Sequence, residues 1–260
     1  MRLAVLATLF AAGLSLGLNG AKAEDALVGG GPQYLIDVGI GGLAKPKYPG
    51  ADTYIIVPYP LFGVGRFYIP GVGQRESNAH GFYLYPSFGY QGERNPNDDN
   101  SLKGTKKVPW TLELGLGAGF KGQWLRGFGS IRQGINGTDG QVGDLGLDVV
   151  VPVTSAFDVA FGPRASFAST EYMETYFGVT GKEASKGSLS KYQPDGGFKS
   201  VGLAASASYS LTERTKLRFT GSWNRFVGDA DKSPIVKAGS HDQWMAGIGI
   251  TYRLGFNLFR

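Results

Sequence analysis

The chain has 260 residues, of which 42 are glycine and none is cysteine; 42% are hydrophobic, 18% are charged, and the formal charge is +5. Glycine at more than twice its usual share of roughly 7% excludes a mainly helical protein, because each glycine inside a helix costs about 1 kcal/mol relative to alanine. The absence of cysteine excludes a disulfide framework, thiol catalysis and thiolate metal sites. An aromatic-rich, all-β protein is the class that remains.

The first 23 residues are typical of a secretory signal peptide. Arg2 supplies a positive start, residues 3–18 are apolar and uncharged, and Ala21-Lys22-Ala23 has the small-x-small pattern of a cleavage site. We therefore predict a signal peptide over residues 1–23 and a single domain over residues 24–260. Loss of Arg2 and Lys22 leaves 24 basic and 21 acidic residues. This mild, scattered excess does not indicate a nucleic-acid partner.

Apolar residues alternate with small or polar residues along most of the remaining chain, which predicts β-strands with one apolar face. In chain order the clearest alternations cover residues 34–41, 110–120, 145–151, 157–167, 200–209, 216–224 and 243–256. Two segments are less regular. Residues 54–62 carry Pro58 and Pro60, which a central strand tolerates poorly, and residues 121–133 mix the two faces.

Short connections alternate with long polar ones, as in bacterial outer-membrane barrels with short periplasmic turns and longer outer loops. Residues 154–155 and 211–213 are short links, whereas residues 91–107, 173–196 and 228–241 are long. We predict a transmembrane, antiparallel, up-and-down β-barrel of about ten strands with a narrow lumen. If Arg66–Ile69 forms one more strand, parity requires twelve. A soluble β-sandwich also alternates, but its polar face would carry more Thr, Lys and Glu than this glycine-, alanine- and serine-rich one.

The strand pattern assigns charged side chains to the lumen and aromatic side chains to the lipid face. The predicted lumen-facing charges are Asp37, Glu113, Asp144, Asp148, Asp158, Arg164, Lys216, Arg218 and Arg253. Five acids against four bases predict ion pairs that bridge the wall, with a narrow selective pore as the alternative. The predicted interfacial girdle comprises Trp110, Phe120, Tyr209, Trp223, Trp244, Tyr252 and Phe256.

Several motifs resemble the MipA/OmpV family of outer-membrane proteins. They are the run Tyr48-Pro49-Gly50-Ala51-Asp52 followed by Pro58-x-Pro60, the run Tyr176-Phe177-Gly178-Val179-Thr180, and the run Asp229-Ala230-Asp231-Lys232-Ser233-Pro234. The resemblance implies an outer-membrane β-barrel. It also implies the role of the family's eponymous member, which is a scaffold that brings a lytic murein transglycosylase together with a bifunctional murein synthase.

Nothing in the sequence predicts a catalytic, cofactor or metal site. The one enzyme candidate is His241 with Asp229, Asp231 and Asp242, and a His beside an Asp is far more often a loop residue. Three functions therefore stay open: a non-enzymatic scaffold for murein enzymes, a narrow channel or surface adhesin that uses the long outer loops, and, least favoured, a surface hydrolase. Outer-membrane lipids are expected partners in all three.

Overall fold

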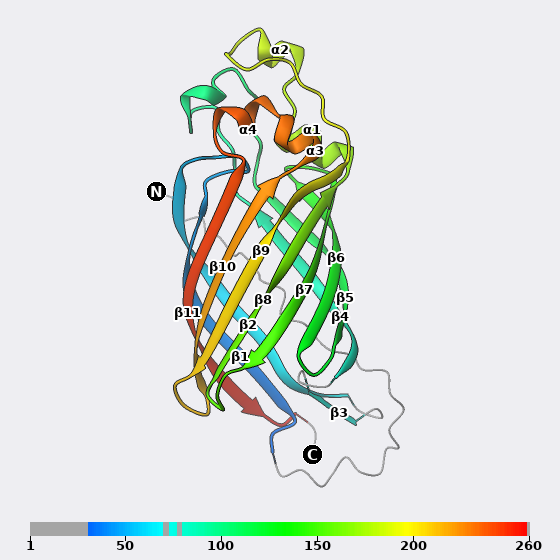
Figure 1. The fold of residues 1–260 in the computed structure, drawn as a ribbon, viewed down its shortest axis with the longest axis vertical. Coiled ribbons are helices and arrows are strands. Elements are labelled where there is room, and N and C mark those ends of the chain that lie inside the picture. Colours follow the sequence, from blue (N-terminus) through cyan, green and yellow to red (C-terminus); the bar gives the residue numbers. More distant parts are fainter. Residues whose placement is uncertain (1–30, 70–72, 77–79, 259–260) are drawn as a thin grey trace.

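A computed structural model describes residues 31–69, 73–76 and 80–258; the predicted signal peptide lies outside these residues. One antiparallel sheet dominates the fold (Figure 1). Its strands are β1 (Tyr34–Pro46), β2 (Tyr54–Ile69), β3 (Gly73–Glu76), β4 (Gly81–Gln91), β5 (Thr111–Lys121), β6 (Leu125–Asn136), β7 (Gln141–Pro152), β8 (Phe157–Ala168), β9 (Gly197–Ser210), β10 (Thr215–Phe226) and β11 (Asp242–Phe256).

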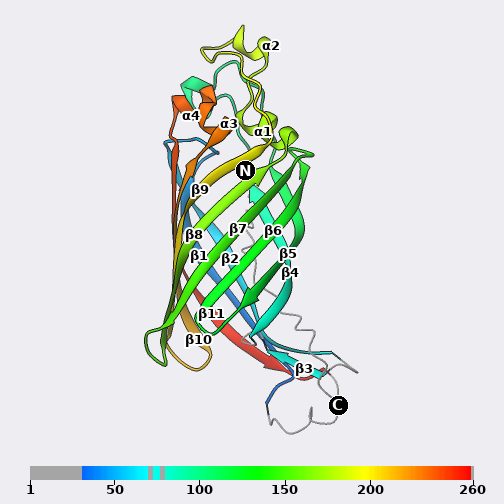
Figure 2. The same ribbon diagram turned by 45° about the vertical axis from the view of Figure 1, so that its right-hand side comes forward.

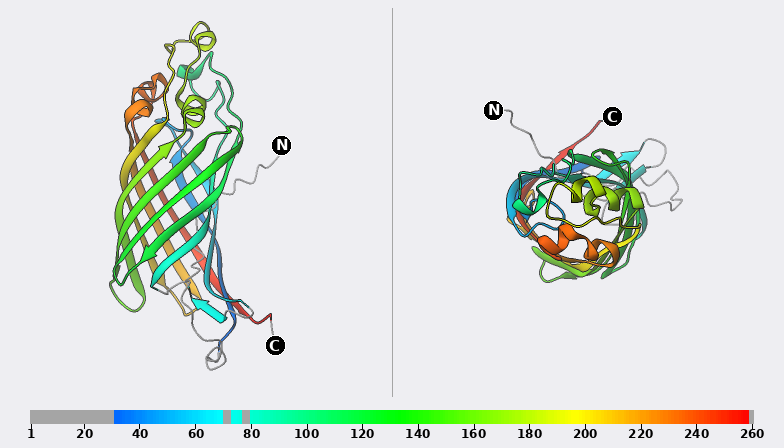
Figure 3. Two further views of the ribbon diagram at one scale, coloured as in Figure 1. Left: turned by 90° about the vertical axis from the view of Figure 1, so that its right-hand side faces the viewer. Right: turned by 90° about the horizontal axis from the view of Figure 1, so that it is seen from above.

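Each long strand pairs with its neighbour in the chain, and β1 also pairs with β11, so the first and last strands lie side by side. The sheet curls around a central axis (Figure 3). Ten strands are long and β3 has only four residues. The prediction of an all-β, antiparallel barrel of about ten strands is therefore confirmed. Residues 66–69, considered as a separate strand, are the end of β2 and pair with β3.

The two ends of the strand order are the β2–β3 hairpin and β4. Within the described residues, no hydrogen-bonded ladder joins them, so β2 and β4 are edge strands along a seam. Pro58 and Pro60 lie in β2 and Pro86 lies in β4. Proline has no N–H to donate and is tolerated on an edge strand. The irregularity of residues 54–62 in the sequence thus marks the edge of the sheet.

The connections differ at the two ends of the barrel. Residues 122–124, 153–156 and 211–214 are tight turns at one end, where the β2–β3 hairpin also lies (Figure 2). The opposite end carries the helices α1 (Thr170–Phe177), α2 (Gly181–Ala184), α3 (Gly228–Lys232) and α4 (Pro234–Ala238), and the 3₁₀ helix η1 (Asn100–Leu102). In residues 31–69, 73–76 and 80–258, no helix has the length and apolar character to span a membrane. By loop length, the helical end is the outer one.

Aromatic rings lie against glycines of adjacent strands. A Cβ at Gly117 would come within 2.1 Å of a ring carbon of Tyr85. Two more such pairs face the lumen: Gly41 with Tyr59, and Gly119 with Tyr83. Glycine therefore leaves space for tyrosine side chains inside a narrow barrel, which explains part of the glycine excess.

Candidate functional site

The outer mouth of the barrel is covered by a cap, which we define as residues 92–110, 169–196 and 227–241. Seen from above, its helices lie across the opening (Figure 3). Apolar side chains of all three segments are buried together in two clusters. These are Val108, Val142, Ala168, Tyr172, Met173, Tyr176, Phe177, Phe226, Ala230 and Val236, and next to them Tyr48, Ala51, Leu102, Val179, Leu189 and Ile235. Such burial makes the cap a packed layer.

Hydrogen bonds join the cap segments to one another. Arg94, which is almost fully buried, donates from Nη1 to the carbonyl oxygen of Tyr176 at 2.6 Å. Ser233 donates to the carbonyl oxygen of Phe177 at 2.7 Å, and Tyr192 donates to that of Asp229 at 2.8 Å. Because buried carbonyl groups need donors, these contacts hold the segments in one arrangement.

Two tyrosines of α1 extend from the cap into the upper lumen. The hydroxyl of Tyr176 donates to Thr111 at 2.6 Å, and that of Tyr172 donates to Glu113 at 3.2 Å. Burial raises the pKa of Tyr176 to about 12 and that of Tyr172 well above its usual value, so both hydroxyls keep their protons and act as donors. The cap is thus anchored to the barrel wall through β5.

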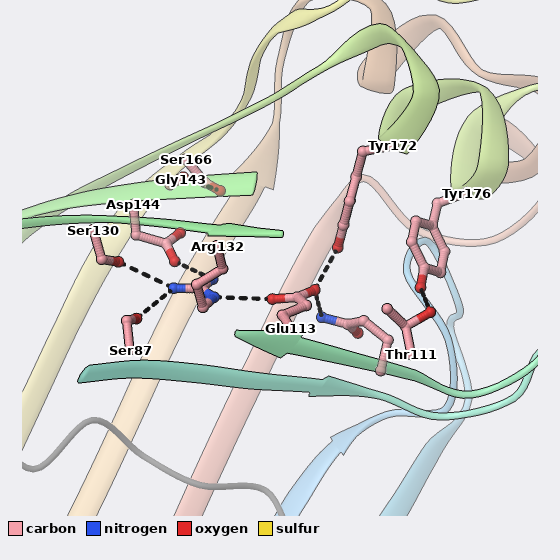
Figure 4. A network of polar contacts seen from close by, with 11 residues as sticks. Ser87, Thr111, Glu113, Ser130, Arg132, Gly143, Asp144, Ser166, Tyr172 and Tyr176 are labelled. Carbon is pink, nitrogen blue, oxygen red and sulfur yellow. Dashed lines mark hydrogen bonds and ion pairs between the residues drawn. The ribbon is translucent and has the colours of Figure 1, made fainter. Parts of the chain in front are cut away.

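Beneath the cap, Arg132 of β6 bridges two carboxylates on neighbouring strands (Figure 4). Its Nε lies 3.0 Å from Glu113 Oε2 and its Nη2 lies 2.6 Å from Asp144 Oδ2. Its Nη1 donates to Ser87 at 3.2 Å and to Ser130 at 3.1 Å. The guanidinium therefore ties together β4, β5, β6 and β7.

Two further clusters each place two arginines on one aspartate. Asp148 of β7 accepts a hydrogen bond from Arg126 at 2.5 Å, and its Oδ1 lies 2.6 Å from Arg164 Nη2 in an ion pair. Across the barrel, Asp37 of β1 accepts two bonds from Arg253, at 2.7 and 2.9 Å, and lies 3.4 Å from Arg218. The structure thus brings most of the predicted lumen charges together in ion pairs. Asp158 and Lys216 make no such pair in the described part of the chain; Lys216 acts on Asp37 electrostatically.

Sequence reasoning missed five basic residues of the inner wall. They are Lys45, Lys121, Arg126, Arg132 and Lys199, each of which interacts with a lumen carboxylate or a side chain of the cap. Arg126 and Arg132 were hidden because Gly127 and Gly129 occupy the outer face of β6, so that strand shows little apolar alternation. Lys199 was hidden by a bulge in β9 opposite Ser166 and Phe167. The predicted set of five acids and four bases therefore leaves out these five basic side chains.

The predicted girdle aromatics fall near the two ends of the strands and mostly pair with rings of adjacent strands. Trp110 stacks on Tyr90, and Trp223 lies 6.2 Å from Trp244, at the outer end. At the other end, the pairs are Phe120 with Phe82, Tyr209 with Phe157, and Phe256 with Tyr34, and Tyr252 is exposed nearby. Their contact with lipid headgroups stays a prediction.

Of the four residues of the enzyme candidate, the His241 side chain pairs only with Asp231. His241 Nδ1 lies 2.5 Å from Asp231 Oδ1 at the outer rim. Asp229 instead pairs with Lys232, and Asp242 pairs with Arg225 and accepts from Trp223. Among residues 31–69, 73–76 and 80–258, no group of three or more His, Asp or Glu side chains is placed to hold a metal ion.

A curled antiparallel sheet with apolar outer faces, a charged lumen and aromatic residues near both rims defines an outer-membrane β-barrel protein. The model of the family described as MltA-interacting protein MipA matches residues 38–254. The chain belongs to this family.

Two curated relatives are named as outer-membrane proteins. Omp26La of Vibrio anguillarum is 30% identical and OmpV of Vibrio cholerae is 29% identical, each over 164 residues that cover 59% of this chain and 58% of the relative. The match therefore spans less than two thirds of their length. Among solved structures, the COG4313 outer-membrane channel of Pseudomonas putida F1 aligns over 90% of this chain and 100% of its own, with a TM-score of 0.42 and 10% identity.

Proposed function

We propose that this protein is a non-enzymatic scaffold of the outer membrane, which holds a lytic murein transglycosylase and a bifunctional murein synthase at its periplasmic end. The family description supports the first partner, because it names an MltA-interacting protein. The observation that carries the proposal is the closed outer mouth. A barrel whose opening is packed with buried side chains is poorly suited to general diffusion, so a binding role accounts better for it.

The periplasmic contact surface is assigned to the β2–β3 hairpin. The three tight turns offer little area, whereas β2 has 16 residues and continues into the hairpin at this end of the barrel. A two-stranded ribbon at the rim supplies a sheet edge to a partner.

The scaffold is tested by capture of the two purified murein enzymes on the detergent-solubilised barrel. Wild-type protein should retain both enzymes, and a variant lacking residues 73–79 should lose at least one. Ser155→Ala, in a turn at the same end, is the matched control and should bind as wild type does. Failure of the wild type to retain either enzyme would refute the scaffold, and full retention by the deletion variant would refute the assigned surface.

A narrow channel is the second candidate, favoured by the charged and partly accessible lumen. Planar-bilayer recording separates the two candidates, because a channel produces conductance steps and a sealed scaffold does not.

A further inference from the structure

The lumen of this barrel carries an excess of positive charge. On the inward faces of β1 and β4 to β11 there are nine basic and five acidic side chains. The basic ones are Lys45, Lys121, Arg126, Arg132, Arg164, Lys199, Lys216, Arg218 and Arg253, and the acidic ones are Asp37, Glu113, Asp144, Asp148 and Asp158. These strands therefore carry four more basic than acidic side chains on their inner faces.

In the two arginine clusters, the carboxylate is hidden and the guanidinium groups are accessible. The side chain of Asp148 is 1% exposed, whereas those of Arg126 and Arg164 are 37% and 23% exposed. Asp37 is 8% exposed, and its partners Arg218 and Arg253 are 35% and 30% exposed. A solute in the lumen meets the arginines, because each carboxylate lies behind them.

Each of these clusters also keeps a net positive charge, since two guanidinium groups share one carboxylate. The two clusters lie on different walls, with Asp148 on β7 and Asp37 on β1. A concave site lined by one sign of charge and bounded by low-dielectric walls concentrates ions of the opposite sign. Ser206, an inward residue of β9, is exposed, so the space between the walls is open to solvent.

We propose that the lumen below the cap is an electropositive vestibule that admits and concentrates small anions from the periplasm and disfavours cations. The chemistry suits carboxylates, sulfonates and phosphates of small solutes, because guanidinium groups bind planar and tetrahedral oxyanions through paired N–H donors. The vestibule is independent of the scaffold role, since it depends on the lumen and not on the hairpin.

The absence of cysteine from the chain provides a direct test. A Ser206→Cys variant places one thiol in the lumen, and a Ser155→Cys variant places one in an exposed periplasmic turn. The thiols are treated with a negatively charged, sulfonate-bearing methanethiosulfonate reagent and with a positively charged trimethylammonium one. For each variant, the measured quantity is the rate with the sulfonate reagent divided by the rate with the ammonium reagent. This ratio should be at least about tenfold larger for Ser206→Cys than for Ser155→Cys.

Arg218 and Arg225 supply a matched pair for the same experiment, because they lie on the same strand and face opposite sides. Arg218→Gln in the Ser206→Cys background should lower the sulfonate preference several-fold, while Arg253 keeps both of its bonds to Asp37. Arg225→Gln, which removes an outer-rim pair with Asp242, should leave the preference unchanged. Heat-modifiable gel migration checks that each variant is folded.

Equal reactivity with the two reagents, or a preference for the ammonium reagent, would overturn the proposal. So would a Ser206→Cys thiol that neither reagent modifies while Ser155→Cys reacts, because the vestibule would then be closed. An unchanged preference in Arg218→Gln would remove this arginine as a source of the selectivity and overturn the assignment of the Asp37 cluster.

Discussion

At the scale of single residues, the lumen is organised by arginines that reach across strands. Arg132 contacts side chains from four strands, and no aliphatic or lysine side chain could make the same set of directed bonds. Arg132 stabilises the fold mainly by pairing with two carboxylates, because a buried charge without a partner costs more free energy than the pair contributes.

Replacement of Arg132 with methionine should therefore lower the free energy of unfolding by about 3 kcal/mol, since Glu113 is left buried without its cation. The further changes Glu113→Gln and Asp144→Asn in the same chain should restore most of the loss. Urea unfolding of the barrel in detergent measures both. A triple variant as unstable as Arg132→Met would show that packing around the guanidinium, and not charge, dominates.

Arg94 has the equivalent role in the cap, where it donates to the carbonyl oxygens of Tyr176 and Thr175. Arg94→Met should make the cap easier to open by about 2 kcal/mol, because these hydrogen bonds to a charged donor are lost. The measurement is the rate at which protease cleaves the outer segments of the folded barrel. Lys107→Ala, which removes an exposed pair with Glu93, serves as the control and should change this rate little.

At the scale of elements, glycine sets how closely strand faces and aromatic rings approach. Gly117→Ala should destabilise the barrel by about 1–3 kcal/mol, because the new Cβ would overlap the ring of Tyr85. Gly42→Ala is the matched control on β1, where the nearest atom would be 4.0 Å away, and it should be close to neutral. Similar losses at the two positions in urea unfolding would indicate a backbone effect common to strand glycines.

The small helix α2 depends on the ionised carboxylate of Glu183, which completes a capping box with Thr180 and accepts from the Lys106 N–H at 2.6 Å. Burial acts to raise the pKa of Glu183, but these hydrogen bonds outweigh it and hold the pKa below its usual value of 4.5. A lowered pKa in the folded loop means that its stabilisation is complete above pH 4.5 and is lost as the pH falls below that value.

A nitroxide label on a Ser188→Cys variant should therefore keep its mobility above pH 4.5 and become more mobile as the pH falls below that value. In Glu183→Gln the label should be mobile throughout and insensitive to pH. Glu174→Gln, an exposed acid of the same segment, should keep the wild-type response. A pH response that survives in Glu183→Gln would place the titrating group elsewhere.

The strands themselves were readable from the sequence, and the exceptions have physical causes. Alternation located β5, β8 and β11 because their outer faces are almost continuously apolar. It failed on β6, where glycine replaces apolar residues on the outer face, and it missed the start of β9, where a bulge changes the parity at Lys199. Helices α1 to α4 went unpredicted, because segments of four to eight residues leave no detectable periodicity.

At the scale of the whole molecule, the sheet has one seam and one capped end. The N- and C-terminal strands are paired, so the unpaired edges fall between β2 and β4, where three prolines reduce the number of N–H groups that lack a partner. The cap closes the outer end by packing and not by the strands. Part of the cap can therefore be deleted without changing the pairing of the strands.

Replacing residues 170–195 with a short glycine-serine turn should open the barrel, because Ala168 and Gly197 are already paired and the strands can stay in register. In planar bilayers the wild type should give few or no conductance steps, whereas the deletion variant should give frequent ones that favour anions, as expected from the nine basic and five acidic inner side chains. Heat-modifiable migration confirms that the variant is folded. A folded variant without conductance would mean that the lumen is blocked below the cap, at the level of the Arg132 network. Equal conductance in the two proteins would mean that the cap does not seal the mouth.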